Sequence, residues 1–146
     1  MKVKQALKQK KKLASKMNEM FGRVSAYNSV EEGTTRVYDA KESMAEWMRM
    51  SQELVELKTK IHLANAPVYG KIFRMSELKS QLSNLKMLDC TEGKYNDSYG
   101  RRMGNDPIMK TTQIALLERD QMIASIEDEI EKIQEELDEH NATTSI

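Results

Sequence analysis

The sequence predicts an all-α protein of four long helices in an antiparallel, coiled-coil-like bundle, with a long loop between the third and fourth helices. Apolar residues recur in alternating three- and four-residue steps along four stretches, which keeps an apolar stripe facing a neighbour. Charged residues make up 32% of the chain and aromatic residues 5%, with only 6 glycines and 2 prolines. This composition is typical of helix-rich proteins. We expect a single helical domain over residues 1–146.

The first helix is predicted over residues 3–27, where Ala6, Leu13, Met17 and Val24 belong to the apolar stripe. Its other positions are strongly basic and include one acid, Glu19; the basic residues are Lys2, Lys4, Lys8, Lys10, Lys11, Lys12, Lys16 and Arg23. This pattern favours a solvated face or a partner for an acidic helix. A helix that binds nucleic acid or a membrane surface is the alternative. It is disfavoured because the basic residues surround the helix, and none of the N-terminal ones has an aromatic neighbour.

The second helix is predicted over residues 40–65, after a loop around Gly33. Asp39 followed by Glu42 is typical of a helix N-terminus, and Asn65-Ala66-Pro67 of a helix end. One stripe contains Trp47, and its members are Trp47, Met50, Leu54, Leu57, Ile61 and Ala64. A second register runs beside it through Met44, Met48, Ser51, Val55 and His62. Two stripes predict two neighbours, so Trp47, Met48, Val55 and His62 are interface candidates.

The third helix is predicted over residues 71–88, and a loop over residues 89–110 follows it. The loop is rich in Gly, Asn, Asp and Ser and contains Pro107, and loops of this length are often functional. Its candidate contact residues are Tyr95, Tyr99, Arg101 and Arg102, together with Lys94. A protruding or partner-docking loop is the favoured interpretation, anion binding is the alternative, and a small hairpin is equally compatible.

The fourth helix is predicted over residues 111–141, with Ile123, Ile126, Ile130, Ile133 and Leu137 in its stripe. The rest of its surface is acidic, with ten acids between Glu118 and Glu139 against Arg119 and Lys132. In an up-down-up-down bundle the first helix runs antiparallel to the last. We therefore expect the lysines of residues 2–16 to lie beside the acids of residues 127–139, within one chain or across two.

No catalytic, cofactor or metal site is predicted. The histidines, His62 and His140, lack the Glu-x-x-His spacing of a bundle metal site, and neither they nor Cys90 form a nucleophile–base motif. A single cysteine cannot form an internal disulfide. The start, MKVKQALKQKKK, lacks the apolar core of a signal peptide, and no stretch reaches membrane-spanning length. We expect no enzymatic activity.

Several short motifs lie at the predicted helix ends: KVKQAL (2–7), Asn28…Glu32-Gly33, Tyr38-Asp39, Ile61…Asn65, Gly70-Lys71 and LDEHNATTSI (137–146). Together they resemble the septicolysin-like family of small all-helical proteins of uncharacterised function. Ser145 stands where that family prefers an acid, and residues 89–107 depart from its pattern. Relatives of this kind among bacteriophage products imply a virion or assembly role. No pore hairpin or span accompanies the resemblance, so no toxin role is carried over.

These observations predict a non-enzymatic structural or assembly protein that self-associates through helical apolar faces, as a phage virion or assembly component. Its partners would be further copies or other structural proteins, in the cytoplasm or the virion. The net charge is zero, which disfavours nucleic acid as a partner, and no membrane, cofactor or small-molecule substrate is expected. The alternative is a regulatory binding module that contacts nucleic acid or another anionic partner through the basic loop 94–102.

Overall fold

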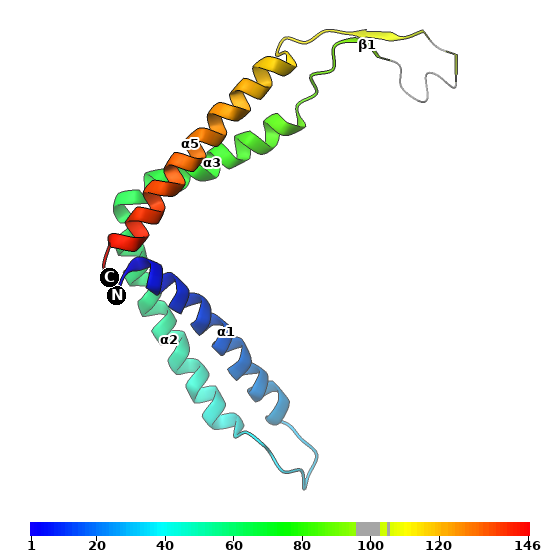
Figure 1. Ribbon diagram of the computed structural model, residues 1–146. Coiled ribbons are helices and arrows are strands. Elements are labelled where there is room, and N and C mark those ends of the chain that lie inside the picture. The colour runs from blue at the N-terminus through cyan, green and yellow to red at the C-terminus, as the bar shows by residue number, and fades with distance from the viewer. Residues whose placement is uncertain (96–102, 105) are drawn as a thin grey trace. The chain divides into compact units, whose positions relative to one another are not determined.

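The computed structural model describes residues 1–95, 103–104 and 106–146, and its mostly helical content confirms the all-α class. The helices are α1 (Val3–Tyr27), α2 (Ala40–Asn65), α3 (Tyr69–Met87) and α5 (Leu116–Thr143), with a short 3-10 helix, η1 (Ala66–Val68), before α3. Strands β1 (Gly93–Tyr95) and β2 (Ile108–Lys110) pair between α3 and α5 (Figure 1). The chain divides into a first unit, Met1–Tyr69 with Asp138–Ile146, and a second unit, Gly70–Leu137.

The helix ends follow local sequence signals in the first half of the chain. α1 and α2 have the predicted bounds, and the carboxylate of Asp39 caps α2 by accepting a hydrogen bond from the Glu42 amide at 2.8 Å. α3 begins at Tyr69 rather than at residue 71 and ends at Met87. The last helix begins at Leu116, not at residue 111. The intervening segment contains Thr111 and Thr112, whose β-branched side chains disfavour helix and follow directly on β2.

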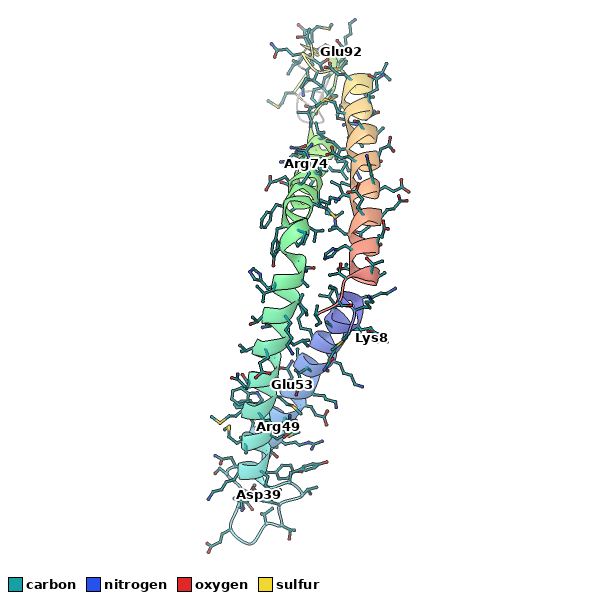
Figure 2. All side chains as sticks on the ribbon, turned by 90° about the vertical axis from the view of Figure 1, so that its left-hand side faces the viewer. Lys8, Asp39, Arg49, Glu53, Arg74 and Glu92 are labelled. Atoms are coloured by element: carbon teal, nitrogen blue, oxygen red, sulfur yellow. The ribbon has the colours of Figure 1, made fainter. Side chains whose placement is uncertain are left out.

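In the first unit, α1 and α2 lie side by side and antiparallel (Figures 1 and 2). Near one end, Ala6 of α1 packs with Leu57 and Ile61 of α2. Near the other end, the rings of Phe21 and Trp47 lie 5.3 Å apart. Each helix therefore buries one stripe, and the apolar residues buried in this unit are Val3, Ala6, Leu13, Val24, Met50, Leu57, Ile61 and Val68.

The two ends of the chain are joined within the first unit. Lys2 and Ser145 form an antiparallel bridge, and the Val3 amide donates to the Thr144 carbonyl at 2.9 Å. The Lys2 ammonium donates to the Thr143 carbonyl at 2.6 Å. His140 lies between Asn65 Oδ1, at 3.2 Å from Nε2, and Thr144 Oγ1, at 3.1 Å from Nδ1. His140 is thus part of the structural connection that holds the C-terminal residues against the end of α2.

In the second unit, α3 packs against α5 around Met75, Leu78 and Ile133. The partly buried residues Ile126, Ile130 and Leu137 of α5 surround this core. Only Leu78 among these buried residues is almost fully enclosed, with 1% of its surface exposed. A pair of helices with so small a core depends strongly on each of its buried side chains.

Leu78→Ala should lower the free energy of unfolding of the second unit by about 2–5 kcal/mol, because it removes buried apolar atoms and leaves a cavity. Urea unfolding followed by circular dichroism measures this change. The matched control is Leu117→Ala, at a leucine of the same unit that is 71% exposed. We expect the control to change the free energy by less than about 0.5 kcal/mol. Equal effects of the two variants would contradict the assigned core.

Candidate functional site

The second apolar register of α2 lies on the surface of the first unit. Met48 is 61% exposed and Val55 is 54% exposed, and His62 is exposed as well. Trp47 differs from them, because it is half-buried and packs on Phe21 within the unit. The structure therefore separates the α2 candidates into an internal contact, Trp47, and a solvent-facing row, Met48, Val55 and His62, which we call the α2 stripe.

The α2 stripe has a groove at one end and a side-chain hydrogen bond at the other. At the start of α2, Met48 borders a groove of about 320 Å³ that Val24, Met44 and Ala45 also line. At the other end, the Tyr69 hydroxyl forms a hydrogen bond with His62 Nδ1, and the two rings lie 5.1 Å apart. His62 is therefore held in place by the side chain of Tyr69.

The loop candidates are only partly described. Tyr99, Arg101 and Arg102 lie outside the described residues. Tyr95 is in β1, which pairs in antiparallel register with β2 from Gly93↔Lys110 to Tyr95↔Ile108. The Lys110 ammonium lies 4.6 Å from the centre of the Tyr95 ring and 3.1 Å from Asp89 Oδ2. The sequence left a hairpin open as one interpretation of residues 89–110, and these contacts show how its base is held.

Asp89 is the acidic centre of this hairpin base. Its carboxylate accepts a hydrogen bond from the Thr91 amide at 2.9 Å and pairs with Lys110. Hydrogen bonds from Thr91, then the hydrogen bond from Lys110 and its charge, hold the pKa of Asp89 well below its ordinary value. In the adjoining groove, the hydroxyl of Thr112 is buried without a hydrogen-bond partner among the described residues.

The acidic face of α5 finds its partners on α3. Nε and Nη2 of Arg74 donate to the two carboxylate oxygens of Glu129, at 2.9 and 3.1 Å. The Lys71 ammonium pairs with Glu136 at 2.7 Å. Lys86 also pairs with Glu127, at 3.4 Å. Hydrogen bonds from Arg74 and from Lys71 lower the pKa values of Glu129 and Glu136 respectively.

The expected pairing of these acids with the lysines of α1 is therefore wrong for Glu127, Glu129 and Glu136. The basic residues of α3, which the sequence also contains, are their partners. Charge alone predicts the wrong partner, because the basic run in residues 2–16 is longer than the one in α3. The spacing of Lys71 and Arg74 beside the apolar stripe of α3 was the available signal.

The described part of the chain contains neither a metal cluster nor a helix suited to crossing a membrane. No group of three or more His, Cys, Asp or Glu side chains in that part of the chain is arranged to hold a metal ion. None of the described helices combines the length and the apolar character needed to cross a membrane. Cys90 is a free, partly exposed thiol.

Comparisons of the chain with models of known protein families, with curated proteins and with solved structures give no match.

Acid should weaken the second unit through Glu129 and Glu136. Their pKa values are lower in the folded protein than in the unfolded chain, so the unfolded chain binds protons first as the pH falls. The contribution of the pairs is complete above about pH 4.3, the ordinary carboxyl pKa, and is lost as the pH falls through the folded values. Glu129→Gln with Glu136→Gln should lower the melting temperature at neutral pH and flatten its fall between about pH 5 and pH 3.

Thermal melts followed by circular dichroism at a series of pH values test this expectation. Glu77→Gln is the control, since Glu77 is an exposed glutamate of α3 without an ion pair in the described structure. It should leave the pH profile unchanged. An unaltered profile in the double variant would mean that the two pairs do not contribute to stability.

Proposed function

We propose that this protein is a non-enzymatic structural or assembly protein that self-associates through apolar helix faces. The observation that carries the proposal is the α2 stripe. Its residues Met48 and Val55 are mostly exposed and lie seven residues apart, whereas another side of the same helix is packed against α1. A regularly spaced apolar row that no part of its own unit covers is typical of a surface that packs against another helix.

The small size of the two cores supports this proposal. Among the described residues, exposed large apolar side chains outnumber buried apolar ones. In the second unit the exposed ones include Met87, Leu116, Leu117 and Met122, close to the ends of α3 and α5. A pair of helices can bury little more than one stripe on each, and further burial requires another chain. Association would stabilise both the assembly and the fold of each copy.

The packing expected within the assembly follows from the helix patterns. The sequence predicts antiparallel, coiled-coil-like packing of the four helices of one chain; packing of this kind would instead form between copies when their α2 stripes meet. Methionine suits such a contact because its flexible, polarisable side chain adapts to a neighbouring surface. The resemblance to the septicolysin-like family, with relatives among phage products, supports a phage particle or its assembly as the setting.

Met48→Gln with Val55→Thr should weaken self-association, because both changes keep the size of the side chain and remove its apolar end. A fully buried side chain of this size contributes about 1.5–3 kcal/mol. Because about 1.4 kcal/mol is a tenfold change in affinity, we expect the dissociation constant to rise about ten- to a hundredfold. Sedimentation velocity over a range of protein concentrations measures it.

Leu63→Gln is the matched control, since Leu63 is also on α2 and is 67% exposed but lies off the α2 stripe. It should leave the dissociation constant nearly unchanged. A wild-type protein that stays monomeric at every concentration would refute the proposed function. An equal loss in the control would refute the role of the α2 stripe.

A further inference from the structure

A row of lysines on α1 has no partner within the described residues. Lys4, Lys8 and Lys11 are exposed and form no ion pair there. Their spacing of four and then three residues places them on one side of α1, opposite the buried Ala6 and Leu13. Figure 2 shows Lys8 projecting from the side of α1 away from α2. We call these three residues the lysine stripe.

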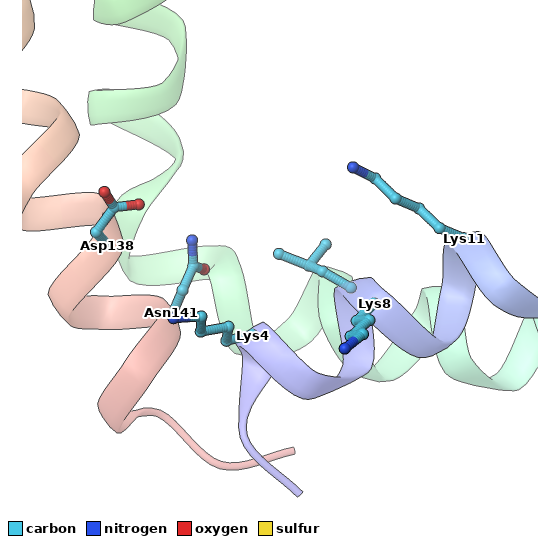
Figure 3. A pocket seen from close by; sticks show the side chains of 6 residues that line it. Lys4, Lys8, Lys11, Asp138 and Asn141 are labelled. Atoms are coloured by element: carbon cyan, nitrogen blue, oxygen red, sulfur yellow. The ribbon is translucent and has the colours of Figure 1, made fainter.

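The lysine stripe lines a groove of about 410 Å³ in the first unit (Figure 3). Leu7 of α1 contributes an apolar surface to this groove, and Asp138 and Asn141 of α5 complete it. The lining thus carries three positive charges against one negative charge. A surface of this composition suits an anionic partner that also has some apolar area.

A matching row of acids lies on α5 in the second unit. Asp128, Glu131 and Glu135 are exposed and unpaired in the described structure, whereas Glu127, Glu129 and Glu136 have their partners on α3. Their spacing of three and then four residues places them opposite the packed side formed by Ile126, Ile130 and Ile133. We call these three residues the acidic stripe.

We propose that the lysine stripe of one copy docks antiparallel on the acidic stripe of a second copy. Along α1 the lysines are separated by four and then three residues. Along α5 in the reverse direction, from Glu135 through Glu131 to Asp128, the acids are also separated by four and then three. Each row spans about 10 Å of helix at 1.5 Å per residue. Lys4 therefore aligns with Glu135, Lys8 with Glu131, and Lys11 with Asp128.

This proposal rests on the proposed function and specifies its geometry. Exposed ion pairs contribute little affinity individually, so the apolar α2 stripe supplies most of the attraction. The charge rows favour the antiparallel alignment, since it matches all three spacings, whereas a parallel arrangement offsets the central pair by one residue and a shift along the helix leaves charges without a partner. Because the two rows are different surfaces, the contact is heterologous, and the joined pair keeps one unused lysine row and one unused acidic row, which permits rings or longer arrays.

Charge reversal with a mixing experiment tests the pairing. The first variant carries Lys4→Glu, Lys8→Glu and Lys11→Glu, and the second carries Asp128→Lys, Glu131→Lys and Glu135→Lys. In each variant both rows have the same sign, so each alone should self-associate at least about tenfold more weakly than the wild type. An equimolar mixture should regain the wild-type mass, because each row then meets its opposite in the other variant.

Sedimentation velocity and light scattering measure mass, and circular dichroism verifies that each variant is folded. The matched control, Lys58→Glu with Lys60→Glu and Lys79→Glu, changes the net charge as much as the first variant at exposed lysines off the row. It should keep most of the association. Raising the salt concentration from about 0.05 M to 0.5 M should weaken the wild type more than either variant.

The outcomes separate this inference from the proposed function. A wild type that associates, loses mass in the Met48→Gln, Val55→Thr variant and keeps its mass in both charge variants would overturn the stripe pairing alone. Failure of the mixture to regain mass would overturn it too. Binding of duplex DNA by the wild type that the first variant loses, with self-association unchanged, would assign the lysine stripe to nucleic acid and overturn the inference.

Discussion

The structure depends on the limited burial that two packed helices can achieve. Each helix of the pair α1 and α2 covers one stripe of its partner, around Ala6, Leu57 and Ile61 at one end and Phe21 and Trp47 at the other. Side chains off that line remain in solvent, whatever their polarity. Met48 and Val55 are the consequence on α2, and Leu117 and Met122 show the same effect on α5. The exposed apolar surface of this protein therefore results from the packing of helices in pairs, in which each helix covers only one stripe of its partner.

Local signals account for the parts of the fold that the sequence predicts well. Asp39 and Glu42 define the start of α2 through one hydrogen bond, and Pro67 follows its end, so the bounds of α2 depend on residues within a few positions. Local sequence does not define the start of the last helix, because Thr111 and Thr112 fit either an extended segment or a helix interior. Pairing of β2 with β1, seventeen residues away from Gly93 to Lys110, decides it.

Charge patterns predict less, because they do not specify which neighbour is present. The acids of α5 and the lysines of α1 have complementary composition, but Glu129 and Glu136 are paired by Arg74 and Lys71 of α3. The apolar side of α5 packs against α3. The nearest cations, on α3, therefore form ion pairs with the acids beside that side. The two apolar registers of α2 show the same limit. The sequence predicts a neighbour for each of them. In the structure Trp47 packs on Phe21 inside the unit, whereas Met48 is mostly exposed.

This division of the α5 acids also explains why zero net charge does not imply electrostatic neutrality at the surface. Acids beside the packed side are neutralised locally, whereas Asp128, Glu131 and Glu135 on the opposite side are not. On α1, Ala6 and Leu13 occupy the side that α2 covers, and Lys4, Lys8 and Lys11 lie on the opposite side. Within a single chain, unpaired charge of either sign faces water at little cost. In the proposed docking of two copies the same rows would favour one direction, since an antiparallel arrangement matches the spacing of all three opposite charges.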